Sequence, residues 1–135
     1  MNFASRIVSQ TCDASADAVY EFAHRVENLP RWAAGLATRL EQEDGQWFTD
    51  TPQGRLRIDM APRNALRVMD HDVTLPGGLT VHNAFRVTPT GDGSLLSFVV
   101  LRMPDATDAE FDRDCTLVAT DLRMLATLVE RGPRR

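Results

Sequence analysis

The chain has 135 residues, 43% of them hydrophobic and 25% charged, and a formal net charge of −4 at pH 7. This length fits one domain with one hydrophobic core, spanning residues 1–135. The composition is that of an ordinary globular protein and excludes a disordered or fibrous chain.

The charged residues narrow the classes of partner. All 15 basic residues are arginines, scattered among 19 acidic residues without forming a basic stripe, so we expect no nucleic-acid partner. No run reaches the ~18 apolar residues that a membrane-spanning helix needs, and residues 1–13 lack the apolar segment of a secretion signal. We therefore expect a cytoplasmic protein without membrane insertion, in which Cys12 and Cys115 are buried, reduced thiols.

The N-terminal third predicts one strand and two short helices. Residues 2–12 alternate weakly, as a strand does, and Asp13 or Ser15 can cap the helix that follows. The apolar face of that helix consists of Val19, Phe22, Ala23 and Val26. A second short helix can begin after Asn28 and end at Gly35.

The middle of the chain, residues 36–103, changes to a period of two with regularly spaced turn signals. The breaks fall at Asp44-Gly45, Pro52-Gln53-Gly54, Pro62-Arg63-Asn64, Pro76-Gly77-Gly78 and Thr90-Gly91-Asp92-Gly93. Short runs between such turns predict a meander of antiparallel strands. The pattern gives six strands here and seven with the N-terminal one.

The last segment predicts one long helix. Thr107 and Glu110 form a capping box at its start, and Gly132-Pro133 is a stop signal. A first apolar stripe on this helix contains Phe111, Cys115, Val118, Leu122, Leu125 and Val129. A second stripe, about 120° away, contains Leu117, Met124 and Leu128. The first stripe must be buried against the sheet. The second either packs on the N-terminal helices or strand ends, or forms a homodimer contact or the apolar mouth of a pocket.

The order of these elements resembles the START-like (SRPBCC) superfamily, which includes polyketide cyclase/dehydrase and lipid-transport-like proteins. The local resemblances are Ala18-Val19-Tyr20-Glu21-Phe22, Glu27-Asn28-Leu29-Pro30-Arg31-Trp32, Thr51-Pro52-Gln53-Gly54, Met69-Asp70-His71-Asp72-Val73 and Phe111-Asp112-Arg113-Asp114. The resemblance implies an α+β helix-grip fold: a curved antiparallel sheet of six to seven strands around a long C-terminal helix, with two short helices after the first strand. Such proteins include carriers, enzymes and chaperone-associated modules, so the fold does not choose the chemistry.

The hairpin around Pro76-Gly77-Gly78 supplies the most specific candidate site. A three-residue loop pairs Val73 with Val81, His71 with Asn83 and Met69 with Phe85, which leaves one face apolar except for the second pair. A buried polar group without a partner costs about 1–3 kcal/mol, so His71 and Asn83 need each other, a water or a ligand. Asn83 can fix the tautomer of His71 and leave its second ring nitrogen for a ligand or for general acid/base catalysis. Alternatively, the two side chains only satisfy each other, or His71 lies at a wet pocket edge. His82 and Asp72 pair on the opposite face.

Further candidates for ligand contact share an expected inward position. They are Trp32, Ile58, Met60, Met69, Phe85, Phe98, Arg102, Phe111 and Leu122. The last strand leaves a choice, because either Leu96, Phe98, Val100 and Arg102 face inward or their neighbours do. Arg102 can meet an acidic ligand group or lie on the surface, Trp32 can line the pocket or belong to the core, and either Trp47 or Phe48 points inward.

The sequence contains no nucleophile elbow, no glycine-rich phosphate loop, no HExxH motif and no CxxC motif, and its three histidines lie in different elements. We therefore expect neither a metal nor a cofactor. The first functional hypothesis is binding of a small hydrophobic or aromatic molecule between sheet and helix. The alternatives are a cyclase/dehydratase-type enzyme with His71 as its catalytic acid/base, and a protein-interaction adaptor that uses the second stripe.

Overall fold

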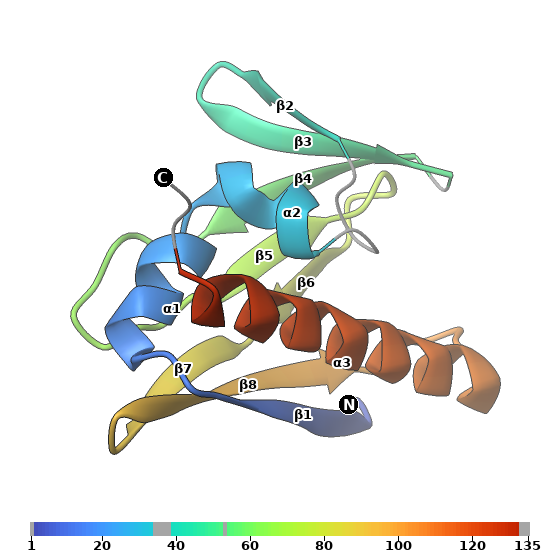
Figure 1. Ribbon diagram of the computed structural model, residues 1–135. Coiled ribbons are helices and arrows are strands. Elements are labelled where there is room, and N and C mark those ends of the chain that lie inside the picture. Colours follow the sequence, from blue (N-terminus) through green and yellow to red (C-terminus); the bar gives the residue numbers. More distant parts are fainter. Residues whose placement is uncertain (1, 34–38, 53, 133–135) are drawn as a thin grey trace.

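The structure is a computed structural model that describes residues 2–33, 39–52 and 54–132, and it has the expected α+β helix-grip fold (Figure 1). Its elements, in chain order, are β1 (Ser5–Cys12), α1 (Ala16–Ala23), the short 3-10 helix η1 (Val26–Asn28), α2 (Leu29–Trp32), β2 (Leu40–Glu43), β3 (Gln46–Thr51), β4 (Gly54–Met60), β5 (His71–Thr74), β6 (Thr80–Asn83), β7 (Phe85–Thr90), β8 (Gly93–Leu101) and α3 (Asp108–Glu130). Within these ranges no helix is both long and apolar enough to cross a membrane.

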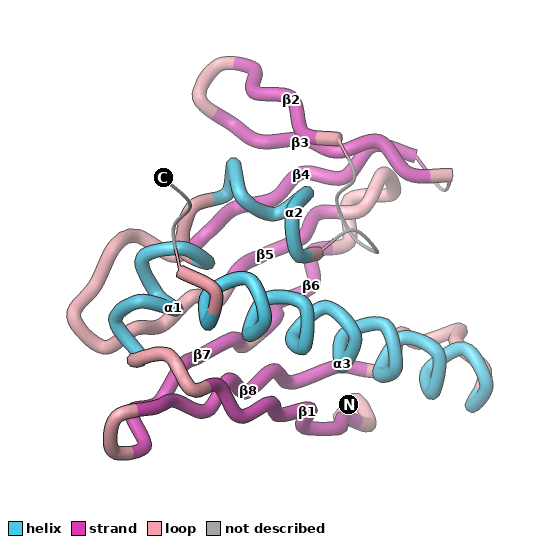
Figure 2. Tube along the Cα trace, in the orientation of Figure 1, coloured by secondary structure: helices cyan, strands magenta, loops and turns pink. Residues whose placement is uncertain are grey.

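The strands form two antiparallel sheets, one in the order β1-β8-β7 and one in the order β2-β3-β4-β5-β6 (Figure 2). The two sheets meet at Ala84, the single residue between β6 and β7, whose carbonyl accepts a hydrogen bond from Val99 N at 2.9 Å. Asp44-Gly45, Pro76-Gly77-Gly78 and Thr90-Gly91-Asp92-Gly93 fall at turns between strands, Pro62-Arg63-Asn64 lies in the loop between β4 and β5, and Gln53 of the remaining predicted break lies outside the described residues. The change of sheet at Ala84 divides one expected strand into two. The meander therefore has seven strands rather than six.

The register predicted for the β5–β6 hairpin is confirmed. His71 pairs with Asn83, and Val73 pairs with Val81, while Leu75 N donates to Leu79 O at 2.8 Å to close the loop. The buried residues of β8 are Ser94, Leu96, Phe98 and Val100, which decides the open choice of face on that strand. On β3, Trp47 packs against the core, whereas Phe48 lies under the guanidinium of Arg55 at 4.6 Å.

The N-terminal helices begin as predicted, with one choice now decided. Ser15 rather than Asp13 caps α1, because its Oγ accepts a hydrogen bond from Ala18 N at 3.2 Å. Asn28 precedes α2, but its side chain donates to Phe22 O at 2.9 Å instead of capping the helix. The expected helix end at Gly35 lies outside the described residues.

Helix α3 starts with the predicted capping box. Thr107 Oγ1 accepts from Glu110 N at 3.1 Å, and Thr107 N donates to Glu110 Oε1 at 2.8 Å. The helix ends at Glu130, and Gly132 follows with a φ of +71°, a left-handed conformation that glycine adopts without strain. The first stripe is buried or half-buried along the whole helix.

The second stripe divides between different environments. Leu128 packs against the core, while Leu117 and Met124 are 45% and 48% exposed. The stripe is therefore not one continuous apolar surface.

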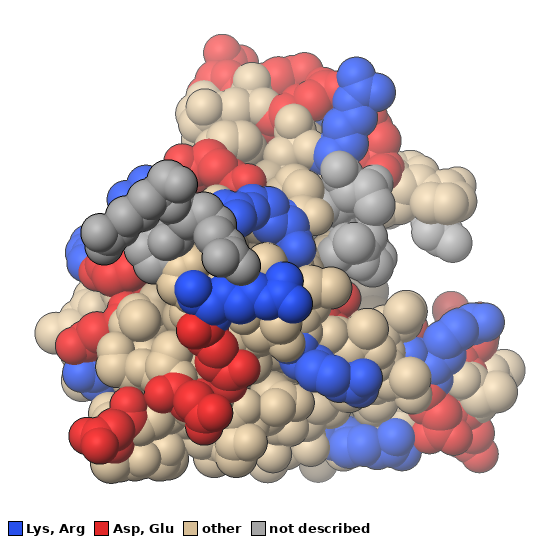
Figure 3. Space-filling model, viewed as in Figure 1, with Lys and Arg blue, Asp and Glu red and all other residues tan. Residues whose placement is uncertain are grey.

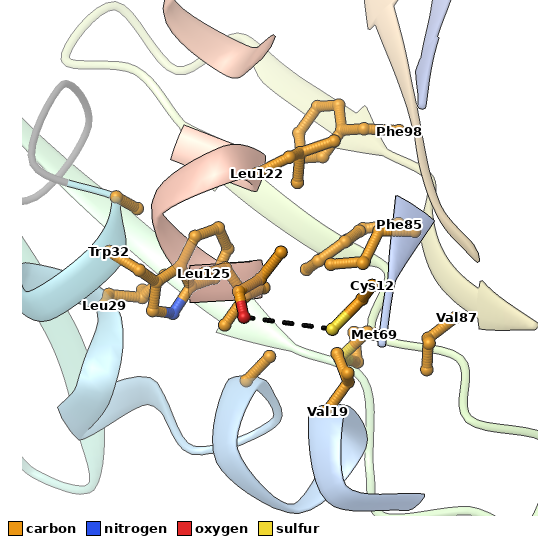
Figure 4. Close-up of a cluster of buried hydrophobic side chains, with 14 of the residues drawn as sticks. Cys12, Val19, Leu29, Trp32, Met69, Phe85, Val87, Phe98, Leu122 and Leu125 are labelled. Atoms are coloured by element: carbon orange, nitrogen blue, oxygen red, sulfur yellow. Dashed lines mark hydrogen bonds between the residues drawn. The ribbon is translucent and has the colours of Figure 1, made fainter. Parts of the chain in front are cut away.

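The core lies where α1, α2 and α3 cover the sheets, and Figure 4 shows part of it. Cys12 and Cys115 are buried free thiols, as expected, and Cys12 Sγ lies 3.9 Å from Ala126 O. Helix α3 packs mainly on β1 and also touches α1, α2 and β8. Because these contacts are with the three-stranded sheet and the N-terminal helices, space remains between α3 and the five-stranded sheet.

Candidate functional site: a cavity between sheet and helix

A cavity of about 810 Å³ lies between α3, α2 and the strands β3, β4, β5, β6 and β8. Most of its walls are apolar. These walls consist of Leu29, Trp32, Ala33, Leu56, Val73, Leu75, Val81, Phe98, Val100, Leu101, Met103, Ala106, Leu117, Val118 and Leu122. Figure 3 shows the molecule hollowed between the β3–β4 turn and the N-terminal half of α3, where the cavity reaches solvent.

The rim beside β5 depends on a close approach of two turns. Gly54 has a φ of +123°, and a Cβ at this position would lie 2.6 Å from Pro76 Cγ in the β5–β6 loop. Only glycine allows this approach without movement of one turn. The two turns therefore pack against each other next to Pro52 and Leu75, and both of these residues line the cavity.

A row of aromatic rings supports one side of the cavity. The ring centroids of Trp32 and Phe85 are 5.6 Å apart, those of Phe85 and Phe98 are 5.5 Å apart, and those of Phe98 and His71 are 5.8 Å apart. Figure 4 shows Trp32, Phe85 and Phe98 together beside Leu122. All three pairs are tilted, at separations typical of stabilising aromatic contacts. The row forms the floor of the cavity, with Trp32, Phe98 and His71 at its surface and Phe85 buried behind them.

His71 is the most deeply buried polar group of the cavity wall, with 3% of its surface exposed. Its Nδ1 lies 3.1 Å from Met69 O, and its Nε2 lies 3.4 Å from Asn83 Nδ2. Because a carbonyl only accepts, Nδ1 carries the proton and Nε2 is the acceptor. Met69, and not Asn83, therefore fixes the tautomer of His71. Asn83 Nδ2 makes only a long contact, of 3.4 Å, to the single lone pair of Nε2.

Burial also decides the charge of His71. Desolvation lowers the pKa of this imidazole, and the hydrogen bond to Met69 O opposes the shift without reversing it. His71 is thus a neutral ring with a basic nitrogen at the cavity wall.

The opposite face of the hairpin carries an exposed ionic cluster. His82 Nδ1 lies 2.7 Å from Asp72 Oδ1, as predicted, and His82 Nε2 lies 3.2 Å from Asp70 Oδ2. The hydrogen bond to Asp72 raises the pKa of His82. Burial alone would raise the pKa of Asp70, but hydrogen bonds from Arg86, Phe85 N and His82 outweigh it and lower that pKa. This cluster belongs to the outer surface and not to the cavity.

Two carboxylates of α3, Asp114 and Asp121, line the cavity and were not among the predicted site residues. Burial raises the pKa of both side chains, and that of Asp121 reaches about 6. A signal was present in the sequence, because at 100° per residue both positions lie between the two apolar stripes of α3. An acidic side chain between two apolar stripes has apolar side chains on both sides.

The structure brings five of the predicted ligand-contact residues to the cavity wall: His71, Asn83, Trp32, Phe98 and Leu122. Two others, Met69 and Phe85, are fully buried in the core behind the wall. Ile58 and Met60 line a different, smaller cavity of about 480 Å³, next to Trp47 and His24. Met69, Phe85, Ile58 and Met60 face the interior, as the alternation along their strands predicted. Alternation does not distinguish a core position from a position in the cavity wall.

Arg102 and Phe111 also lie away from the cavity wall. Arg102 Nε and Nη2 donate to Ala106 O at 3.1 and 2.8 Å, and its guanidinium also pairs with Asp108. These bonds close the loop before α3, so Arg102 is not directed at an acidic ligand group. Phe111 is buried under the guanidinium of Arg6, 4.9 Å from its ring centroid.

Comparison with known proteins identifies the fold. No protein-family model matches the sequence, and no curated protein matches it. Among solved structures, the Aha1 dimer from Colwellia psychrerythraea has a TM-score of 0.73 at 12% identity, over 97% of this chain and 99% of that one. Norcoclaurine synthase from Thalictrum flavum, in complex with dopamine and hydroxybenzaldehyde, has a TM-score of 0.65 at 17% identity, over 98% and 91%.

A third structure, DynU16 from the dynemicin biosynthetic locus, has a TM-score of 0.69 at 15% identity. The match covers 95% of this chain but 48% of DynU16. The chain shares the helix-grip fold with these structures, which is the fold that the resemblance to the START-like (SRPBCC) superfamily implied. At such identities the likeness defines the fold alone.

Proposed function

We propose that the protein binds a small, largely apolar or aromatic molecule in the cavity between α3 and the sheets. The observation that carries this proposal is a cavity of about 810 Å³ whose apolar walls contain one deeply buried, neutral histidine. A concave site whose walls are mostly apolar and that also contains polar groups is typical of small-molecule binding. The complex of norcoclaurine synthase with two small aromatic compounds supports the same class of ligand.

The test is to fill the cavity from a wall residue. Val81 on β6 lines the cavity, and its neighbour Thr80 is exposed on the opposite face of the strand. Val81→Trp places an indole in the cavity, whereas Thr80→Trp adds the same bulk outside. We expect Val81→Trp to weaken binding of the neutral fluorescent probe N-phenyl-1-naphthylamine about tenfold or more, since a wall side chain then occupies its volume. Thr80→Trp should bind it like the unmodified protein.

Fluorescence titration measures both affinities, and native mass spectrometry of the purified protein detects any ligand carried through purification. If the unmodified protein does not bind the probe, or if Val81→Trp binds it as tightly, the cavity is not the binding site.

A second candidate function, proton transfer by His71, is favoured by one observation. Met69 O holds the proton on Nδ1, so Nε2 is a neutral base at the wall of an apolar cavity. A suitable probe is 5-nitrobenzisoxazole, a neutral aromatic compound. A base removes its C–H proton, and the electron pair of the C–H bond forms the third C–N bond of a nitrile. The N–O bond breaks at the same time, and its electron pair remains on the nitrophenolate oxygen.

We expect the protein to accelerate this reaction and His71→Gln to abolish the acceleration. His82→Gln, which changes the exposed histidine, should leave it intact. An equal rate for His71→Gln and the unmodified protein would remove His71 from the mechanism.

A further inference from the structure

The cavity wall that α3 supplies is acidic. Asp114 and Asp121 are seven residues apart, two helical turns, and therefore lie on the same face of α3. Val118 and Leu122 line the cavity beside them. The two carboxylates are thus part of the wall and not of the solvent-exposed side of the helix.

The charges around the cavity do not balance. Among the described residues that line it, five carry carboxylates: Asp50, Asp105, Glu110, Asp114 and Asp121. Arg113 is the one cation in that set, and His71 is neutral at physiological pH. A cleft with apolar walls and charges of one sign concentrates ions of the opposite sign.

Asp121, like Asp105 and Asp114, has no hydrogen-bond or ion-pair partner among the described residues. Burial raises the pKa of both Asp114 and Asp121, and only for Asp121 is that shift large. Among the other acids of the wall, Glu110 accepts the capping hydrogen bond from Thr107 N, and Asp50 pairs with Arg55 at 3.4 Å. Within residues 2–33, 39–52 and 54–132, no donor or cation is within bonding distance of the Asp121 carboxylate. Burial raises its pKa to about 6, so the ionised form is costly at this position. Unpaired acids that cost folding stability inside a cavity are candidates for ligand contact.

We propose that the cavity takes a ligand with an apolar or aromatic body and a cationic amine group, and that Asp121 binds the amine. This inference rests on the proposed function and specifies its ligand class. The ammonium group supplies the missing counter-ion of Asp121 through a charge-assisted hydrogen bond. The body of the ligand lies along the floor near Phe98 and Trp32.

The second polar group of the wall fits the same ligand class. His71 Nε2 is an acceptor whose single lone pair has only a long contact from Asn83 Nδ2, at 3.4 Å, so a hydroxyl or N–H group of the ligand can displace that contact and donate to it. Asp121 and His71 both accept, and Arg102, the cation expected to meet an acidic ligand, is bonded to Ala106 O instead. A carboxylate ligand therefore finds no matching group on Asp121 or His71.

The experiment compares two probes of nearly equal shape, 2-(1-naphthyl)ethylamine and 2-(1-naphthyl)ethanol, by calorimetric titration at pH 7.5. We expect the amine to bind about five- to tenfold more tightly, as one partly buried ion pair contributes. Asp121→Asn should reduce this preference to about onefold and leave the affinity for the alcohol unchanged. The matched control is Asp112→Asn, which removes a carboxylate of α3 that pairs with Arg6 outside the cavity.

The outcomes separate this inference from the proposed function. If both probes bind equally, or if Asp121→Asn keeps the preference for the amine, the role of Asp121 is wrong and the proposed function stands. If neither probe binds, the proposed function and the amine ligand are both wrong. Asp112→Asn must keep the full preference, and a loss there would mean that general surface charge, not Asp121, selects the amine.

Discussion

At the scale of single residues, the cavity contains two ionisable groups whose pKa values move in opposite directions for the same reason. Burial disfavours the charged form, so it lowers the pKa of His71 and raises the pKa of Asp121 to about 6. At neutral pH the histidine is uncharged, and the aspartate is mostly ionised. Each group therefore makes its own contribution to the pH dependence of folding.

Asp121→Asn should stabilise the protein at neutral pH. Because the folded pKa of Asp121 is above its unfolded value of 3.8, its favourable contribution exists below that value and is lost as the pH rises through about 6. Allowing for water in the open cavity, the gain at pH 7.5 should be about 1–2 kcal/mol and should vanish near pH 4. Urea unfolding at the two pH values measures it. An equal effect of Asp121→Asn at both would show that the carboxylate is not desolvated.

His71→Gln and His82→Gln should change the acid sensitivity of the fold in opposite directions. The pKa of His71 is lowered in the folded state, so its contribution is full above its ordinary value of 6.5 and is lost as the pH falls. The pKa of His82 is raised, so its contribution is full below 6.5 and is lost as the pH rises.

Between pH 7.5 and pH 5, His71→Gln should therefore lose less stability than the unmodified protein, and His82→Gln should lose more. Urea unfolding at both pH values tests the pair. If the two variants shift in the same direction, at least one of these environments is wrongly assigned.

At the scale of elements, the capping box of α3 should have a measurable effect on stability. Thr107→Ala removes the acceptor of Glu110 N and should lower the free energy of unfolding by about 1 kcal/mol. Thr120→Ala is the matched control, because Thr120 is exposed within the same helix and its hydroxyl donates only to Thr116 O, at 3.0 Å. Alanine favours a helix interior, so that change should be neutral or slightly stabilising. Equal losses in the two variants would contradict a specific role for the cap.

The elements that the sequence predicted well are those set by local patterns. Thr107 and Glu110 are three residues apart, and the β5–β6 register follows from alternating side chains around one loop. The change of sheet at Ala84 has no such pattern, since it depends on how two sheets meet. Met69 and Phe85 are buried in the core and do not reach the cavity wall. Their position likewise depends on packing between segments that are distant in the sequence.

At the scale of the whole molecule, the cavity results from where α3 lies. The helix packs on β1, α1, α2 and β8, so Val73 of β5 and Val81 of β6 line a cavity instead of packing against α3. The apolar stripes place Asp114 and Asp121 between them, but they do not show that a cavity lies opposite these two residues. Asp121 lies between the two stripes, and its location in a cavity wall can be recognised only once the opposite wall is known.

Open apolar volume costs stability, and a ligand that fills it should restore some. N-phenyl-1-naphthylamine at ten times its Kd should add about 1.4 kcal/mol and raise the Tm by about 3–6 °C. Val81→Trp fills the same volume from within, so the probe should no longer raise its Tm, whereas Thr80→Trp should respond like the unmodified protein. Differential scanning calorimetry with and without the probe measures all three. An equal rise in Val81→Trp would mean that the probe binds elsewhere on the molecule.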